Sequence, residues 1–190
     1  WMREEFDVLG TPPFAERGKV TDEYIRAFKE LWVSPNPQFE GQYCRFSNVT
    51  FEPKPVQKPH PPIWTGGEGK AALRRVARLS DGWHPISSNP RYPLKTFRDL
   101  SAKIDEMGKY IEEEGRDPSS IEIALSASWN EEMSSEPAQH ILVGSPKKIA
   151  DDIGLLNELG VKYLMVGFGA DTLAATLELM DEFISKVAPS

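Results

Sequence analysis

Residues 61–85, PPIWTGGEGKAALRRVARLSDGWHP, place a short apolar run, a cluster of glycines and a basic segment next to one another. The apolar run predicts a β-strand, and the segment from Gly69 to Ser80 predicts an amphipathic helix. Glycines at such a junction let the backbone approach a ligand closely, and the free N–H groups at a helix start attract phosphate. The junction therefore predicts a phosphate site, with Lys70 as a counter-charge. Five consecutive residues form it: Thr65, Gly66, Gly67, Glu68 and Gly69.

A tight turn that binds nothing explains the same glycines equally well. Their spacing matches neither the Walker motif, which needs four residues between its first glycine and Gly-Lys, nor the dinucleotide-binding fingerprint. The carboxylate of Glu68 also disfavours a strongly negative ligand. The local sequence leaves the two interpretations open.

A second polar cluster, DGWHPISSN at residues 81–89, also follows a short apolar run. Trp83 offers a flat apolar wall for a pocket and His84 offers a titratable group. A structural Asp81 and a packed Trp83 are the simpler interpretations for those two residues. The cluster therefore suggests a pocket wall without defining a reaction.

The remaining polar residues do not indicate a catalytic or metal site. Trp129 and Asn130 end a later apolar run, where packing is the simpler explanation. His60 and His140 have no companions at the spacing of metal ligands or of a catalytic triad. No serine, cysteine or carboxylate pair stands out as a nucleophile or an acid/base couple. We therefore predict no metal site, and the catalytic residues stay unknown.

Four strand–helix units account for most of the chain after residue 60. Nearly continuous apolar runs that alternate with amphipathic helices indicate parallel strands covered by helices, which is the α/β class. Four units are half of an eight-stranded barrel, and such a half has an exposed edge and an open interior. The predicted strands lie within 61–67, 81–86, 121–129 and 161–168, and the predicted helices within 69–80, 94–115, 145–160 and 172–187.

The first 60 residues predict a helix and a small hairpin. A helix is expected over 21–32, with Thr21 as its N-cap. The proline-rich segment 33–60 contains two short β-prone pieces, residues 42–46 and 49–53, separated by turn-forming residues. We predict that they pair as a hairpin insertion within a single α/β domain spanning residues 1–190.

The composition excludes several classes of partner. A net charge of −7 disfavours nucleic acid, because an acidic surface repels a polyanion. No apolar stretch approaches the roughly twenty residues that span a bilayer, so no membrane association is expected. The single cysteine excludes an internal disulfide and fits a reducing cytoplasm.

The order of the segments resembles the C-terminal half of the luciferase-like monooxygenase family, especially its deazaflavin-dependent oxidoreductases. The resemblance runs over essentially the whole chain, from WMREEFDVLG at its start to VGSPKKIADDIGLLNELGVKYLMVGF. The most specific part is PKPVQKPHPPI, followed by the glycine cluster, ALRR and DGW. The family's first strands and helices, which supply most of its catalytic residues, have no counterpart in these 190 residues.

The resemblance implies a TIM-type (β/α) barrel, here a partial one, that binds FMN or the deazaflavin coenzyme F-420 at the C-terminal ends of its strands. It favours the phosphate-loop interpretation of Gly66, Gly67 and Gly69. It also implies that Trp1 lies close to the cofactor. Family members are usually dimers, so a homo-oligomer is expected.

The expected function is that of a flavin- or deazaflavin-dependent oxidoreductase, or of a fragment of one. It would transfer hydride to a small organic substrate or monooxygenate it, in the cytoplasm. The alternative is a flavin-binding or structural half-barrel that associates with itself and has no turnover.

Overall fold

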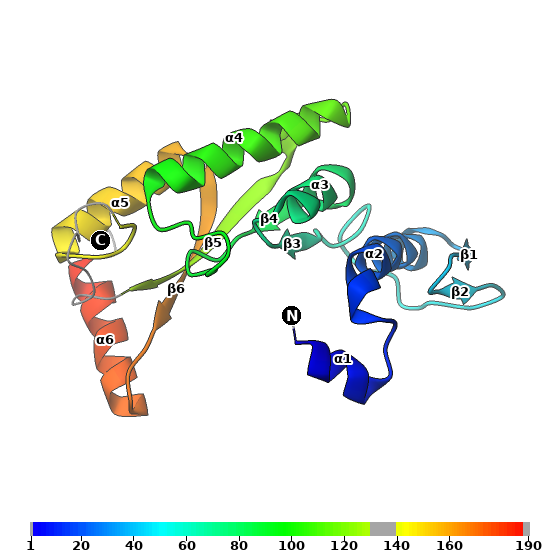
Figure 1. Ribbon diagram of the computed structural model, residues 1–190, viewed down its shortest axis with the longest axis horizontal. Helices are drawn as coiled ribbons and strands as arrows, with labels where there is room; N and C mark the ends of the chain where they lie inside the picture. The colour runs from blue at the N-terminus through cyan, green and yellow to red at the C-terminus, as the bar shows by residue number, and fades with distance from the viewer. Residues whose placement is uncertain (1, 130–139, 188–190) are drawn as a thin grey trace. The chain divides into compact units, whose positions relative to one another are not determined.

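The computed structural model describes residues 2–129 and 140–187 (Figure 1). The chain divides into two compact units, Trp1–Ile63 and Trp64–Ser190. The predicted single domain with an insertion at 33–60 stays a prediction.

The second unit contains a parallel sheet in the order β3-β4-β5-β6, and each strand is followed by a helix. A short 3-10 helix, η2 (Pro118–Ser120), precedes β5. This arrangement confirms the α/β class and the four strand–helix units that the sequence predicted. The strands are β3 (Trp64–Gly66), β4 (Gly82–His84), β5 (Glu122–Trp129) and β6 (Val161–Phe168), and the helices are α3 (Lys70–Leu79), α4 (Phe97–Glu113), α5 (Pro146–Glu158) and α6 (Leu173–Lys186).

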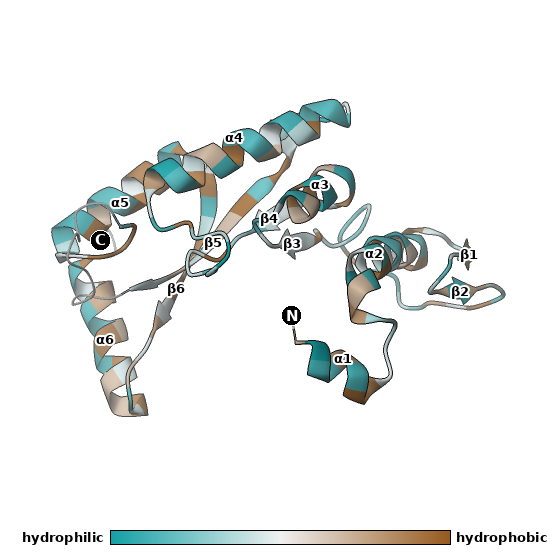
Figure 2. Cartoon of the chain, viewed as in Figure 1, coloured by the Kyte–Doolittle hydropathy of each residue, from teal (hydrophilic) through white to brown (hydrophobic). Residues whose placement is uncertain are grey.

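The core of this unit lies between one face of the sheet and the helices. On β5 every second side chain, from Ile123 to Trp129, is buried in the core, as expected for a strand with one helix-covered face. Leu73 of α3, Leu100 of α4 and Ile149 of α5 are buried against these residues. Figure 2 shows the apolar residues along the sheet and on the sides of the helices.

Three of the four α-helices described in this unit have a side-chain N-cap. Thr96 accepts a hydrogen bond from the Asp99 N–H and forms a capping box at the start of α4. Ser145 caps α5, with Pro146 as the first helical residue, as the sequence predicted. Thr172 caps α6. The N-cap of α3 is Gly69, which has no side chain to accept a hydrogen bond.

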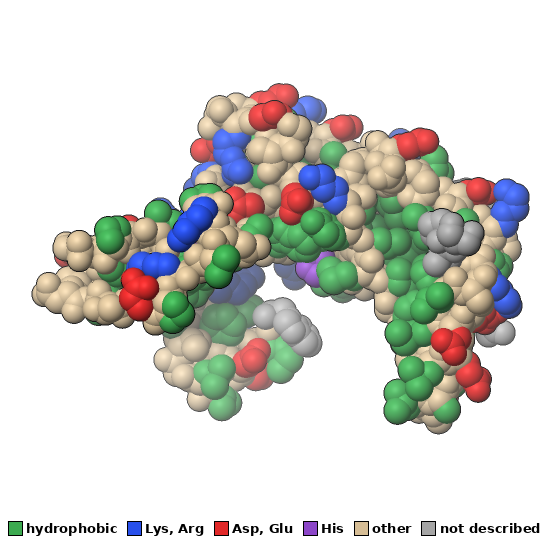
Figure 3. Space-filling view, turned by 180° about the vertical axis from the view of Figure 1, so that it is seen from behind, with side chains coloured by type: hydrophobic (Ala, Val, Ile, Leu, Met, Phe, Trp, Pro, Cys, Tyr) green, Lys and Arg blue, Asp and Glu red, His purple; other side chains and the backbone are tan. Residues whose placement is uncertain are grey.

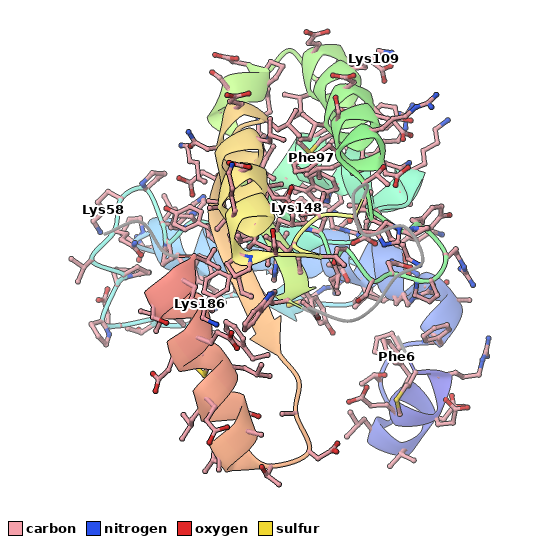
Figure 4. All side chains as sticks on the ribbon, turned by 90° about the vertical axis from the view of Figure 1, so that its left-hand side faces the viewer. Phe6, Lys58, Phe97, Lys109, Lys148 and Lys186 are labelled. Atoms are coloured by element: carbon pink, nitrogen blue, oxygen red, sulfur yellow. The ribbon has the colours of Figure 1, made fainter. Side chains whose placement is uncertain are left out.

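The connection that leads into α5 is fixed by a buried carboxylate. Asp152 accepts hydrogen bonds from the Leu142 N–H at 2.8 Å and from the Lys148 ammonium at 2.6 Å. Lys148, which Figure 4 labels on α5, also donates to the carbonyl of His140 at 2.8 Å. These contacts hold residues 140–142 against the first two turns of the helix.

The first unit contains α1 (Arg3–Leu9), the short 3-10 helix η1 (Phe14–Glu16), α2 (Arg17–Val33) and the strands β1 (Phe39–Glu40) and β2 (Arg45–Phe46). The predicted start of the second helix at Thr21 is wrong, because α2 begins four residues earlier. The Thr21 hydroxyl instead donates to the carbonyl of Arg17 at 2.8 Å inside the helix.

The hairpin is also built differently from the prediction. β1 pairs antiparallel with β2, in the register Phe39↔Phe46, so the hairpin precedes the predicted turn. Residues 49–53, expected as its second strand, are not in a strand. The reason is a long-range contact that the sequence pattern does not show. The buried carboxylate of Glu23 accepts the backbone N–H groups of Gln42, Tyr43 and Cys44, and so fixes the turn between β1 and β2.

Candidate functional site

The face of the sheet that points away from the helices, which we call the inner face, combines aromatic and small side chains. Trp64 lies over Gly82, where an added Cβ would stand 2.3 Å from the indole ring. The Trp64 and Tyr163 rings contact each other, with centroids 4.8 Å apart, although they belong to the first and last strands of the sheet. By alternation along each strand, the inner face consists of Trp64, Gly66, Gly82, His84, Ala124, Ser126, Ser128, Tyr163, Met165 and Gly167.

The predicted phosphate loop lies where β3 ends and α3 begins, at the carboxyl end of the sheet. Gly67 has a φ of +98°, and a Cβ there would come within 2.8 Å of the Ala72 Cβ. A Cβ on Gly66 would lie 3.2 Å from the carbonyl oxygen of His84. The backbone conformation and the close packing therefore both require glycine in this loop.

Two of the five predicted site residues are used inside the protein. The Thr65 hydroxyl lies 2.7 Å from the Ser80 hydroxyl. Glu68 is buried, and its carboxylate accepts the Ile86 N–H at 2.8 Å and the side-chain amide of Asn89. These side chains hold the loop in place, and the ligand-binding role predicted for them stays a prediction.

The loop is also fastened to the next strand by Trp83. Its indole N–H donates to the carbonyl of Gly67 at 3.0 Å, and its side chain is fully buried. Together with the Glu68 contacts, this bond ties the segment after β3 to the segment after β4. The geometry of the two strand ends is therefore fixed before any ligand arrives.

The start of α3 is suited to an anion. The glycine N-cap offers no side-chain acceptor to the first N–H groups of the helix, which belong to Lys70 and Ala71. The helix dipole adds partial positive charge at the same place, and the exposed Lys70 adds a full one. A phosphate group fits this arrangement of donors.

Two polar ring atoms on the inner face are buried without a hydrogen-bond partner in the described part of the chain, namely Trp64 Nε1 and His84 Nε2. Trp129 Nε1 is in the same condition. Sequence reasoning named His84 as a possible pocket residue but gave Trp64 no role. The signal that could have found Trp64 is its position two residues before Gly66, on the same face of the strand.

Two residues singled out from the sequence, Trp1 and Asn130, lie outside the described residues. Among residues 2–129 and 140–187, no three His, Cys, Asp or Glu side chains gather in a way that could hold a metal ion. In the same part of the chain no helix is long and apolar enough to cross a membrane.

The model of the luciferase-like monooxygenase family matches residues 1–130. The chain belongs to this family. It is 30% identical over 213 aligned residues to an FMNH2-dependent dimethylsulfone monooxygenase of Pseudomonas putida, in a match that covers 88% of this chain and 58% of the relative. The chain thus spans little more than half the length of that curated relative.

Solved structures confirm the predicted partial TIM-type barrel. An F-420-dependent secondary alcohol dehydrogenase, in complex with an adduct of F-420 and acetone, matches with a TM-score of 0.69 and 17% identity, over 96% of this chain and 66% of that one. A monooxygenase from Streptomyces bottropensis matches with a TM-score of 0.71 and 19% identity, over 100% and 66%. The relatives include enzymes that use FMNH2 and enzymes that use F-420, which agrees with the two cofactors expected from the sequence.

Proposed function

We propose that this chain supplies the phosphate-binding half of a luciferase-like oxidoreductase that uses FMN or coenzyme F-420 on a small organic substrate. The observation that supports this most directly is the start of α3. There a glycine loop at the carboxyl end of β3 leads into a helix whose first N–H groups have no side-chain cap. The relatives, which act with FMNH2 or F-420, support the choice of cofactor.

In this proposal the bound cofactor supplies the hydride transfer or the oxygen chemistry, and the protein supplies binding and orientation. The N–H groups of Lys70 and Ala71 bind the phosphate, and the Lys70 ammonium offsets its charge. Gly66 and Gly67 let the cofactor lie close to the backbone. The inner face, which includes the rings of Trp64 and Tyr163, gives the planar ring of the cofactor an apolar surface that excludes water.

The test is to replace Gly69 by aspartate. An aspartate N-cap would accept the N–H of Ala71 or Ala72 and would add a negative charge at the place proposed for the phosphate, so the two would compete. We expect Gly69→Asp to weaken FMN or F-420 binding about ten-fold or more, equivalent to about 1.4 kcal/mol. We also expect the unliganded fold to be at least as stable as before, since aspartate is a good N-cap. The cofactor titration is followed by absorbance and the stability by thermal unfolding.

Gly69→Asn is the matched control, because asparagine caps a helix without adding negative charge. Both substitutions place a Cβ 3.1 Å from the ring of Tyr92, which is 40% exposed and can move aside. We expect the asparagine variant to bind the cofactor more tightly than the aspartate variant. Unchanged affinity in the aspartate variant would reject the phosphate site and leave the glycines as a turn.

We further propose that the chain associates with a second copy through α6. Four apolar side chains on this helix are 38–75% exposed, and their spacing of four, three and four residues puts them on one stripe: Leu173, Leu177, Met180 and Ile184. Figure 3 shows the hydrophobic side chains gathered on this helix. The stripe also supports the alternative function, a self-associating half-barrel without turnover.

Light scattering of the purified chain tests this association, and the expected mass is that of two chains. A single-chain mass at micromolar concentration would contradict it. A dimer that fails to bind either cofactor would favour the non-catalytic alternative. We also propose a cytoplasmic location, which the single cysteine supports.

A further inference from the structure

His84 is the last residue of β4, and it lies on the inner face of the sheet beside the glycine loop. Its neighbour Trp83 is fully buried on the helix side, so the alternation of the strand turns His84 the other way. The imidazole Nε2 is buried and has no hydrogen-bond partner among the described residues. A buried ring nitrogen without a partner costs free energy, and a ligand on the inner face would supply the partner.

The backbone on both sides of His84 is held in place by the loop that binds the phosphate in our proposal. Before it, the Trp83 indole donates to the Gly67 carbonyl at 3.0 Å. After it, the Ile86 N–H donates to Glu68 at 2.8 Å. The backbone of His84 therefore has a defined position relative to a ligand bound at the start of α3.

The residues next to His84 on the inner face are small. Gly66 is its direct partner on β3. On the other side, the register Trp83↔Ile123 continues to Ala124 of β5. Neighbouring strands are about 4.8 Å apart, so the imidazole lies about one strand spacing from the end of β3. The short distance places the imidazole close to the polar part of a ligand bound at the end of β3.

We propose that His84 contacts the cofactor: its Nε2 forms a hydrogen bond with the phosphorylated cofactor close to the phosphate. The inference rests on the proposed function, since it needs a phosphate at the start of α3. An imidazole nitrogen can donate or accept a hydrogen bond, and both phosphate oxygens and the hydroxyl groups of a flavin's side chain are suitable partners. His84 thus positions the phosphate-bearing side chain of the cofactor and performs no chemical step.

The experiment compares His84→Leu, whose side chain cannot form a hydrogen bond, with the unchanged protein, using the full natural polypeptide that contains these residues. FMN and F-420 are titrated separately and followed by absorbance. Loss of one hydrogen bond to a charged group predicts an affinity about ten-fold lower. His60→Leu is the matched control, because it removes an imidazole from the other compact unit, where Nδ1 already lies 2.9 Å from the Pro61 carbonyl. The control is expected to keep the original affinity.

A second measurement uses the unchanged protein, so it does not depend on how the variant folds. The nitrogen NMR signals of the histidine rings are recorded before and after the cofactor is added. We expect the His84 signal to shift, while the His60 signal stays in place. A packing role for His84 would not produce that shift.

The outcomes separate the two proposals. If the cofactor binds but His84→Leu keeps the original affinity and the ring signal does not move, the His84 contact is rejected and the proposed function stands. If neither cofactor binds the unchanged protein, both are rejected. Reduced affinity together with a shifted ring signal supports both.

Discussion

Two buried glutamates each hold a different loop of this protein in place. They differ in whether they occupy the backbone N–H groups nearest to them in the sequence or leave those groups without a side-chain acceptor. Glu23 of α2 accepts three backbone N–H groups, at 2.6–2.9 Å, from the turn between β1 and β2. Glu68, next to the start of α3, turns away from the helix amides and binds the segment after β4. One group of backbone amides is filled by the protein's own carboxylate, and the other, at the start of α3, has no side-chain cap and is the group that our proposal assigns to the phosphate.

The difference shows that glycines alone do not identify an anion site. Gly41 is as tightly packed as the glycines of the phosphate loop, since a Cβ there would stand 2.2 Å from the Glu23 carboxylate. Its neighbouring amides are nevertheless occupied. What distinguishes the start of α3 is that the carboxylate next to it in the sequence, Glu68, binds the segment after β4 instead.

The largest effect on stability is expected for Glu23→Gln. The amide nitrogen of glutamine would face a backbone N–H that the carboxylate now accepts, so at least one of three donors would lose its partner. We expect a clearly lower midpoint of thermal unfolding at neutral pH. Circular dichroism during heating measures it.

The same variant has a defined pH dependence. Burial raises the pKa of Glu23, but the N–H groups of Tyr43, Gln42 and Cys44 outweigh it and hold the pKa below its ordinary value of 4.5. The stability from the carboxylate is therefore present above pH 4.5 and is lost as the pH falls through the lowered pKa. The gap between the two proteins should be widest above pH 5 and narrow in acid. A gap that does not change with pH would contradict this account.

A smaller loss is expected for Glu68→Gln, because only two donors bind this carboxylate. The glutamine amide would face either the Ile86 N–H or the side-chain amide of Asn89. The side-chain amide of Asn89 cannot exchange the positions of its oxygen and nitrogen without losing a bond, because the oxygen accepts the Arg91 N–H at 3.0 Å. We expect a loss of about 2 kcal/mol in the free energy of unfolding, measured by denaturant titration, and weaker cofactor binding.

Glu113→Gln is the control for that measurement. Its carboxylate is 58% exposed and pairs with Arg74 at 3.6 Å on the surface, where an ion pair contributes about 0–1 kcal/mol. Equal losses in the two variants would show that Glu68 does not fasten the loop. If Glu68→Gln lowers the stability but leaves cofactor binding unchanged, Glu68 stabilises the loop without contributing to the proposed phosphate site.

The sequence predicted the second unit well because its signals are local. Apolar runs such as residues 161–168 and N-caps such as Ser145 depend on neighbours in the chain. The hairpin was predicted wrongly because its turn is held by Glu23, about twenty residues earlier in the sequence. The roles of Thr65 and Glu68 were hidden for the same reason, since Ser80 and Ile86 are close to them only in the folded chain.

The contact between Trp64 and Tyr163 has a practical consequence. The indole lies on the face where the cofactor is proposed to bind, and its ring is packed against a residue three strands away. Flavins absorb light in the range that tryptophan emits. The protein therefore contains its own fluorescent reporter: cofactor arrival at the inner face would register as quenching of tryptophan emission, and Trp64→Phe would remove the part of that signal that comes from Trp64, without any added label.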